Sequence, residues 1–344
     1  MQPGSQKILS AAVQAAPVYL DLDGSISKAS SLIREAAQKG AKIIAFPETW
    51  LPGYPWWIWL GAPVWGMRFV QQYYENSLVK HGPQWRRLQE IARENEIMVV
   101  MGYSEREGGS LYMGQAIFGA DGTVIASRRK LKPTHVERSV FGEGDGSDLA
   151  VHETPIGRVG ALCCWEHLQP LSKYAMYSQN EQIHVAAWPS FNLYRDIAYA
   201  LGAEVNNAAS RVYAVEGACF VLSPCATISE EMVALLIDSP DKSELLKVGG
   251  GHAMIYGPDG RELAKPLPDT EEGVLYAELD LGSIVLSKAV ADPSGHYSRP
   301  DVTRLLLDGS RRSKVERSGR ELSHQEHQLA ASPGGPGEMG PAEV

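Results

Sequence analysis

Residues 8–46 read ILSAAVQAAPVYLDLDGSISKASSLIREAAQKGAKIIAF. The run at residues 8–13 is short and apolar, which is typical of a buried strand, and residues 43–46 form a second run of this kind. Between them, apolar side chains recur with helical spacing over residues 25–38, and Gly40 is a suitable residue to end that helix. The order strand, helix, strand predicts an α/β fold.

The same order recurs further along the chain. A helical pattern over residues 84–94 leads into an apolar run at 97–101. Two shorter runs, 115–118 and 124–127, flank GADG at 119–122, which is typical of a hairpin and predicts antiparallel strands beside the parallel ones. Further apolar runs that we expect to be strands lie at residues 159–162, 183–187, 219–222, 253–256 and 275–279.

The domain count follows from composition along the chain. At roughly 150 residues per domain, 344 residues would make two domains, but no linker rich in Pro, Gly and Ser separates two halves. After residue 307 large apolar side chains almost disappear and the sequence ends in Pro and Gly. We therefore predict one domain, residues 1–307, and a disordered tail, residues 308–344.

Charge and cysteine usage exclude several classes of protein. The 32 basic and 41 acidic side chains give a net charge of −9, which disfavours nucleic acid as a partner. The most apolar stretch, residues 50–65, is interrupted by prolines and falls short of the ~20 residues of a membrane span, and no secretory signal is evident. Four cysteines are too few for a disulfide scaffold. We expect a cytoplasmic protein with reduced thiols and no membrane contact.

Cys164 is the first candidate for chemistry. The segment GALCCWEHLQP, residues 160–170, carries an apolar strand into two cysteines and then into polar and aromatic residues. A thiol at such a strand end, close to backbone amides or a lysine, can have its pKa lowered from about 8.5 to about 3.5–7.5 and become a nucleophile. The alternative is a small buried cysteine with no chemical role.

Glu48 is the second candidate, in FPETW at residues 46–50. It follows an apolar strand at the carboxyl end, where ligand sites of open α/β sheets lie. Partial desolvation beside a proline and aromatic residues would raise its pKa toward that of a general base. The alternative is an exposed loop carboxylate.

A third candidate is the charged segment RRKLKPTHVE at residues 128–137. It holds Lys132, with Glu137 five residues later, and a cation beside a carboxylate suits an anionic intermediate. The alternative is a solvated charged face.

Two other chemistries, a metal site and a papain-like thiol protease, fit these residues less well. Cys163, Cys164 and His167 lack a second cluster of metal ligands, so we expect no metal site. The surroundings of Cys164 also lack the local signature of papain-like thiol proteases. We expect His167 to orient its loop by hydrogen bonding.

Taken in order, Glu48 in FPETW, Lys132 in RKLKPTHVER and Cys164 in CCWEH resemble the Glu-Lys-Cys triad of the nitrilase superfamily of carbon-nitrogen hydrolases. The resemblance spans residues 6 to about 306. The segments that resemble the nitrilase branch rather than the amidase branches are LPGYPWWIWL (51–60), RRKLKPTHVERSVFGEGDGSDL (128–149), SKYAMYSQNEQIHVAAWPSF (172–191), GPDGRELA (257–264) and DPSGHYSRPD (292–301). The resemblance implies a four-layer αββα sandwich that self-associates as a dimer and as a higher spiral oligomer or helical filament.

The resemblance also implies roles for particular residues. Cys164 would be the nucleophile, Glu48 the general base, Lys132 the cation that stabilises tetrahedral intermediates, and Glu137 an accessory carboxylate. Cys164 is chosen over Cys163 because the family's cysteine directly precedes Trp-Glu, and neighbours on an extended segment point to opposite faces, which leaves Cys163 facing the core. No cofactor and no metal are implied.

The implied activity is hydrolysis of an organic nitrile with two waters to a carboxylic acid and ammonia, through a cysteine thioimidate and thioester, with some amide by-product. Tyr54, His135, Trp165 and Trp188 are the expected substrate-binding residues, and this aromatic set favours aryl or arylaceto nitriles. The alternatives are an aliphatic nitrilase, a cyanide-degrading relative, an amidase and a non-catalytic assembly protein.

Overall fold

The computed structural model describes residues 7–195, 197–313 and 315. The chain divides into a unit of residues Met1–Ser310 and a segment of residues Arg311–Val344, and the fold described below is that of the first unit. Most of the predicted tail, residues 308–344, lies outside the described residues, so its disorder stays a prediction.

Within the described residues, the larger sheet has seven strands in the order β12-β1-β2-β3-β4-β5, with β6 paired to β4. Strands β1, β2 and β3 run parallel, whereas β12, β4 and β5 join antiparallel. The strands are β1 (Lys7–Gln14), β2 (Ile43–Ala45), β3 (Met98–Glu107), β4 (Ser110–Phe118), β5 (Val124–Arg129), β6 (Phe141–Gly142) and β12 (Gly273–Asp280). The mixed sheet expected from the sequence is confirmed.

The second sheet has five strands in the order β11-β10-β9-β8-β7 over the described chain. Its three central strands are parallel and its two edges antiparallel. The strands are β7 (His152–Thr154), β8 (Gly157–Cys163), β9 (Ile183–Ala187), β10 (Phe220–Ser223) and β11 (Met254–Tyr256).

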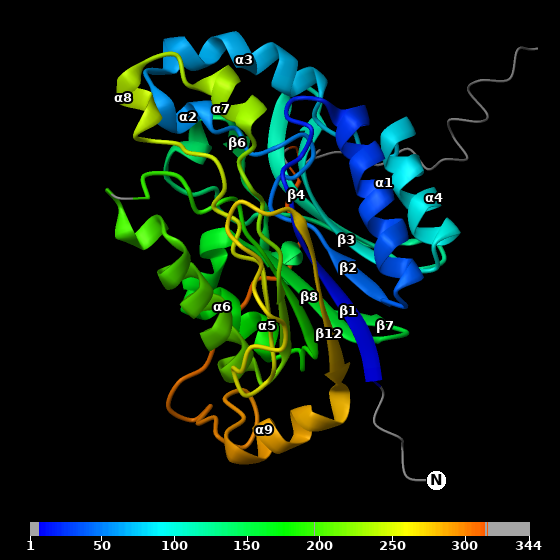
Figure 1. Cartoon of the computed structure of the whole chain (residues 1–344). Coiled ribbons are helices and arrows are strands. Elements are labelled where there is room, and N and C mark those ends of the chain that lie inside the picture. The colour runs from blue at the N-terminus through cyan, green and yellow to red at the C-terminus, as the bar shows by residue number, and fades with distance from the viewer. Residues whose placement is uncertain (1–6, 196, 314, 316–344) are drawn as a thin grey trace, which may run out of the picture. The chain divides into compact units, whose positions relative to one another are not determined.

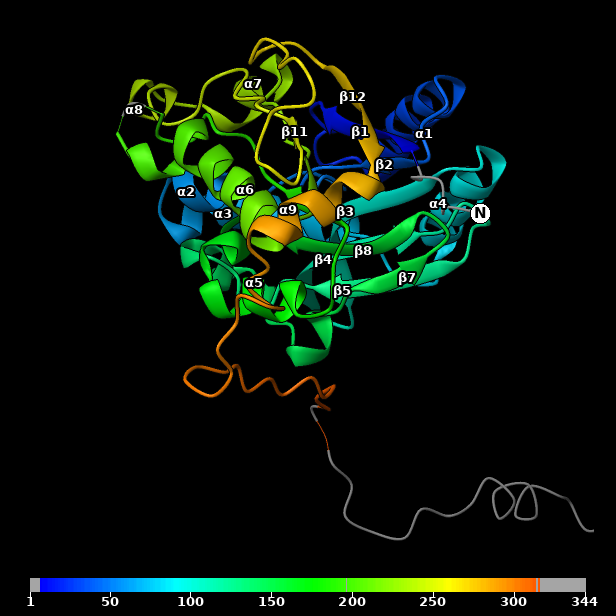
Figure 2. The same cartoon turned by 90° about the horizontal axis from the view of Figure 1, so that it is seen from below.

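Helices cover the outer face of each sheet (Figures 1 and 2). On the larger sheet lie α1 (Leu22–Gln38) and α4 (Pro83–Glu94); on the smaller lie α5 (Pro170–Tyr177) and α6 (Ala203–Gly217). Successive residues of β1 point to opposite faces of the larger sheet. Val13 packs against the helices on the outer face, whereas Ala12 packs against the second sheet. The layers therefore follow the order αββα, as expected.

A third group of elements gathers at one end of the two sheets (Figure 1). It contains α2 (Trp57–Leu60), α3 (Pro63–Glu75), α7 (Glu230–Leu236) and α8 (Pro240–Ser243), while α9 (Ile284–Val290) lies at the opposite end. Trp56 and Trp57 are buried there with Phe69 and Met232. Part of the apolar stretch at residues 50–65, which holds five tryptophans, is thus core. None of the helices in the described part of the chain is long and apolar enough to span a bilayer.

Candidate active site

Cys164 stands where the central strand β8 ends. The strand runs to Cys163, and Cys164 begins the short 3-10 helix η3 (Cys164–Leu168). Its φ is 47°, a left-handed conformation that costs a non-glycine residue on the order of 1–3 kcal/mol. The turn redirects the thiol away from the direction of the strand, and Cys164 lines an internal cavity.

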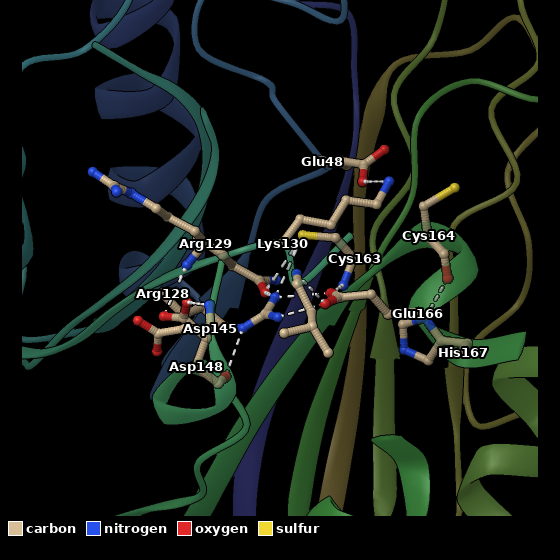
Figure 3. Close-up of polar contacts among 12 residues, drawn as sticks. Glu48, Arg128, Arg129, Lys130, Asp145, Asp148, Cys163, Cys164, Glu166 and His167 are labelled. Carbon is tan, nitrogen blue, oxygen red and sulfur yellow. Dashed lines mark hydrogen bonds and ion pairs between the residues drawn. The ribbon is translucent and has the colours of Figure 1, made fainter. Parts of the chain in front are cut away.

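A buried lysine between two carboxylates forms the charged part of this site. Lys130 Nζ lies 2.9 Å from Glu48 Oε1 and 2.8 Å from Glu137 Oε2, and the three side chains are at most 2% exposed. Lys130 directly follows β5 and Glu48 lies shortly after β2. Figure 3 shows the ammonium of Lys130 meeting the carboxylate of Glu48.

The prediction of Lys132 as the lysine of the site is wrong, because the structure brings Lys130, and not Lys132, to Glu48. The Lys132 side chain is 59% exposed and pairs with Glu143. The reason lies in the strand ladder. The backbone N–H of Lys130 still donates to Met113 O of β4 (2.8 Å), whereas Lys132 lies beyond the sheet, next to a proline.

Glu137 is held by its own short helix, η1 (His135–Ser139). Its Oε2 accepts the backbone N–H of Thr134 at 2.6 Å, and its Oε1 accepts the hydroxyl of Tyr54 at 2.8 Å. Glu137 also lines the cavity that Cys164 lines. The structure therefore brings together Glu48, Glu137 and Cys164 of the four predicted catalytic residues.

Burial sets the protonation of this cluster. It raises the pKa of Glu48 to about 8, against the attraction of Lys130. Burial alone would lower the pKa of Lys130, but Glu137 and Glu48 outweigh it and hold that pKa well above its usual value. Burial, followed by the charge of Glu48, raises the pKa of the Cys164 thiol. The expectation of a lowered thiol pKa is wrong, and the resting thiol is neutral.

A second buried ion pair, Arg128–Glu166, was not predicted from the sequence. It joins the segment that carries Lys130 to the segment that carries Cys164. Arg128 donates to both carboxylate oxygens of Glu166, at 2.7 and 2.9 Å. Glu166 also accepts the backbone N–H groups of Cys163 and Leu131, both at 2.8 Å. One carboxylate therefore fixes the residue before Cys164 and the residue after Lys130. The sequence signal for this pair was an arginine two residues before Lys130 and a glutamate two residues after Cys164.

Cys163 has a separate environment. It is fully buried, with its sulfur 3.6 Å from Gln115 Oε1 and 3.9 Å from Arg128 Nη1. Figure 3 shows the sulfurs of Cys163 and Cys164 pointing in different directions, as predicted from their adjacency. Cys163 is buried in the core as expected, and its neighbours there include the polar side chains of Gln115 and Arg128.

The cavity beside Cys164 has a volume of about 290 Å³. All four predicted substrate-binding residues line it: Tyr54, His135, Trp165 and Trp188. Other aromatic and aliphatic residues that line the cavity include Trp56, Trp59, Phe191, Leu193 and Leu201. The cavity is therefore mainly apolar, with the charged cluster at one side.

The indole N–H groups of two lining tryptophans are satisfied inside the protein. Trp165 donates to Asn206 Oδ1 at 2.9 Å, and Trp188 donates to Ser210 Oγ at 2.8 Å. Trp59 stacks on the ring of His135, with the ring centroids 5.4 Å apart. Since their polar atoms are already paired, these rings present apolar surface to a ligand.

Chemically, the site combines a neutral thiol, a carboxylate of raised pKa and a buried ammonium. These are the parts of covalent catalysis assisted by a general base. Within the described ranges, no group of three or more His, Cys, Asp and Glu side chains is placed to hold a metal ion.

Comparison with known proteins gives the same picture. The sequence model of carbon-nitrogen hydrolase matches residues 9–289. A nitrilase of Pseudomonas syringae pv. syringae is 62% identical over 87% of this chain and 89% of its own length. An arylacetone-specific nitrilase of Alcaligenes faecalis is 51% identical (90% and 87% covered), and an aliphatic nitrilase of Rhodococcus rhodochrous is 50% identical (94% and 88% covered).

The fold also matches a solved structure. The carbon-nitrogen hydrolase of Helicobacter pylori G27 superposes with a TM-score of 0.68, over 86% of this chain and 97% of that chain, at 17% sequence identity. At that identity the likeness concerns the fold alone, and it agrees with the two packed sheets described above.

Proposed function

The chain belongs to the carbon-nitrogen hydrolase family, and from that premise we propose that it is a nitrilase, which hydrolyses an organic nitrile with two waters to a carboxylic acid and ammonia. The observation that carries the proposal is the buried Lys130 between Glu48 and Glu137, beside a cavity lined by Cys164. This arrangement supplies a nucleophile, a base and a cation without a cofactor.

In the first step, the Cys164 thiol adds to the nitrile carbon. A neutral thiol is a poor nucleophile, so a base must take its proton during attack. Glu48 suits this role, because its Oε2 is buried and has no hydrogen-bond partner among the described residues. The proton passes through Glu48 to the nitrile nitrogen as the C≡N bond becomes C=N, which gives a covalent thioimidate.

Water, activated by Glu48, then adds to the thioimidate carbon and gives a tetrahedral adduct. Lys130 is the donor that stabilises charge on this adduct, because the two carboxylates keep it protonated. Ammonia leaves to give a thioester, and a second water releases the acid and restores the thiol. Departure of the thiol before ammonia gives the amide by-product. Removing a single preorganised donor of this kind commonly costs about 10²–10³ in rate.

The cavity favours an aryl or arylaceto nitrile as substrate. Its wall is aromatic, and no lysine or arginine is among its lining residues, so a neutral aromatic ring fits it better than a charged chain. Cyanide would leave most of the volume of about 290 Å³ unfilled. An aliphatic nitrile is the second candidate, since one relative that is 50% identical is an aliphatic nitrilase.

Ammonia release tests this function directly. We expect phenylacetonitrile to be turned over faster than benzonitrile, a dinitrile, cyanide or the matching amides, and Cys164→Ala to abolish turnover. Lys130→Ala and Lys132→Ala form a matched pair, and only the first should lose activity. Faster turnover of amides than of nitriles would contradict the proposal, as would nitrile hydrolysis at the wild-type rate by Lys130→Ala.

We also propose self-association through a surface formed by α6, on the outer face of the smaller sheet, and α9, at the end of the sheets. Exposed apolar side chains gather on α6 and α9, at Val212, Val215, Val285, Leu286 and Val290. Val215 and Leu286 line one surface groove, so the two helices present a single apolar surface for a second copy of this chain. Sedimentation should show an oligomer for the wild type and a smaller species for Leu286→Glu.

We propose a cytoplasmic location, because the four cysteines are free thiols. Cys163, Cys164, Cys219 and Cys225 are all buried and unpaired, which suits a reducing compartment.

A further inference from the structure

A second group of buried polar side chains lies behind Cys164, on the side away from Lys130. His167 Nδ1 lies 2.7 Å from the carbonyl oxygen of Cys164, and His167 Nε2 lies 2.9 Å from His184 Nε2. His184 Nδ1 lies 2.7 Å from Glu181 Oε1, and the Tyr213 hydroxyl donates to Glu181 Oε2 at 2.6 Å. We call these four side chains the histidine chain. Each is at most 1% exposed.

The direction of these bonds fixes the protons. The carbonyl of Cys164 only accepts, so His167 carries its proton on Nδ1, and the Nε2 of a neutral His167 is an acceptor. His184 must then donate from Nε2. If His184 is neutral, its Nδ1 accepts a proton that Glu181 carries; if it is charged, Glu181 is a carboxylate. In both forms the histidine chain is neutral overall.

Burial favours the form in which every member is neutral. Burial raises the pKa of Glu181 to about 8. Burial lowers the pKa of His184 well below its usual value, and burial together with His184 lowers that of His167 to about 3. No arginine or lysine hydrogen-bonds to the chain among the described residues, in contrast to Glu48 and Glu166.

The fold makes room for this group. A Cβ on Gly160 of β8 would lie 2.0 Å from Glu181 Oε1, so a strand residue with any side chain would displace the carboxyl group. The rings of His184 and Tyr213 stack with centroids 3.8 Å apart, and His167 lies 5.3 Å from the ring of Trp188, which lines the cavity. The histidine chain therefore contacts both the Cys164 backbone and Trp188 in the wall of the cavity.

We propose that His167, His184, Glu181 and Tyr213 are positioning residues that hold the Cys164 carbonyl, and through it the left-handed turn that aims the thiol. The inference rests on the proposed function for its kinetic consequence. The argument is geometric: a residue with φ of 47° keeps a strained backbone only where its surroundings fix it, and the His167 imidazole is bonded to that peptide group. The histidine chain in turn fixes the tautomer and orientation of His167.

Isosteric variants separate positioning from general packing. His167→Asn keeps a side-chain N–H near the place of Nδ1, whereas His167→Leu removes it. Glu181→Gln can still donate to His184 and accept from Tyr213, as a protonated Glu181 does, whereas Glu181→Leu cannot. We expect His167→Leu and Glu181→Leu to lower kcat by about 100-fold with KM unchanged, since a displaced catalytic group costs about that much. His167→Asn should recover most of kcat, and Glu181→Gln should match the wild type.

Tyr177→Phe is the matched control. Tyr177 is buried, its ring lies 4.8 Å from that of Tyr213, and its hydroxyl donates to Glu216 rather than to the histidine chain. It should keep the wild-type kcat for phenylacetonitrile. The rate of Cys164 alkylation by iodoacetamide, followed on the cysteine peptide by mass spectrometry, should rank the variants in the same order as kcat.

Three results would overturn the inference: equal losses in His167→Asn and His167→Leu, equal losses in Glu181→Gln and Glu181→Leu, or changes confined to KM. Failure of the proposed function is recognised separately. If the wild type releases no ammonia from any nitrile, the alkylation ranking alone decides whether the histidine chain positions Cys164.

Discussion

Two buried clusters meet at Cys164 and differ in how burial acts on them. On one side, Lys130 stays charged because Glu48 and Glu137 face it within 2.9 Å. On the other side, the histidine chain contains three titratable groups plus a tyrosine and remains neutral by sharing protons. The difference shows that buried groups stay charged here only where an opposite charge faces them. Cys164 lies between a cluster of this charged kind and one that is neutral overall.

The largest effect is expected when the charged cluster loses its cation, Lys130. Lys130→Met leaves two carboxylates buried without their cation, which typically costs about 3–5 kcal/mol of folding stability, and one carboxylate will take up a proton. Nitrile hydrolysis should fall by at least about 10³-fold, since the donor is lost together with the arrangement of the base. Ammonia release and urea unfolding measure the two effects. Lys132→Met is the control and should change neither.

A smaller effect is expected at the joint between the lysine and cysteine segments. Arg128→Met leaves Glu166 buried and without its cation, so we expect a loss of about 3–5 kcal/mol in stability. The backbone N–H bonds from Cys163 and Leu131 remain, so kcat should fall less than in Lys130→Met. Urea unfolding and ammonia release report both values. A larger loss of kcat than in Lys130→Met would contradict this ranking.

The neutral side should appear in the pH dependence of stability. The folded pKa of Glu181, about 8, lies above its usual value of 4.5, so the folded state holds this proton more tightly than the unfolded state. The resulting stability is fully present below pH 4.5 and is lost as the pH rises through about 8. Glu181→Gln lacks this proton. The stability of the wild type relative to Glu181→Gln should therefore fall from pH 5 to pH 8.5 in urea unfolding.

In that experiment Glu48 titrates in both proteins, so its contribution cancels in the difference. A difference that stays constant over the same range would show that the folded state does not hold the Glu181 proton more tightly than the unfolded state does.

The smallest effect should come from the pocket wall, with both clusters intact. Trp59→Leu removes an aromatic ring from the wall of the cavity. One aromatic contact with the phenyl ring of a bound substrate is worth about 1 kcal/mol, or roughly fivefold in affinity. We expect KM for phenylacetonitrile to rise by that factor while kcat and the alkylation rate of Cys164 stay the same. Equal changes for an aliphatic nitrile would argue against an aromatic binding site.

Much of this molecule was predictable from the sequence because the signals were local. The helical spacing at residues 25–38 became α1, and the strand at 159–162 followed by Cys164 became β8 and its turn. Glu48 and Glu137 stand beside a buried lysine, although this lysine is Lys130 and not the expected Lys132. His167 was expected to orient its loop, and its bond to the Cys164 carbonyl confirms that interpretation.

What the sequence did not reveal depends on pairing across the fold. Lys130 and Lys132 lie two residues apart in the same charged segment, and the bond from Lys130 N–H to Met113 O shows which of the two the sheet still holds. Glu181 and Tyr213 come from distant segments, and nothing local marks them as partners of His184. Residues in such networks are recognised by three-dimensional contact rather than by spacing.

The single carboxylate of Glu166 has a consequence for how activity arises during folding. It accepts N–H groups from Cys163, the last residue of β8 in the smaller sheet, and from Leu131, just beyond β5 in the larger one. The active centre therefore cannot be assembled by either sheet alone. During refolding, helix and strand signals in circular dichroism should recover before catalysis, which must wait until the two sheets have docked.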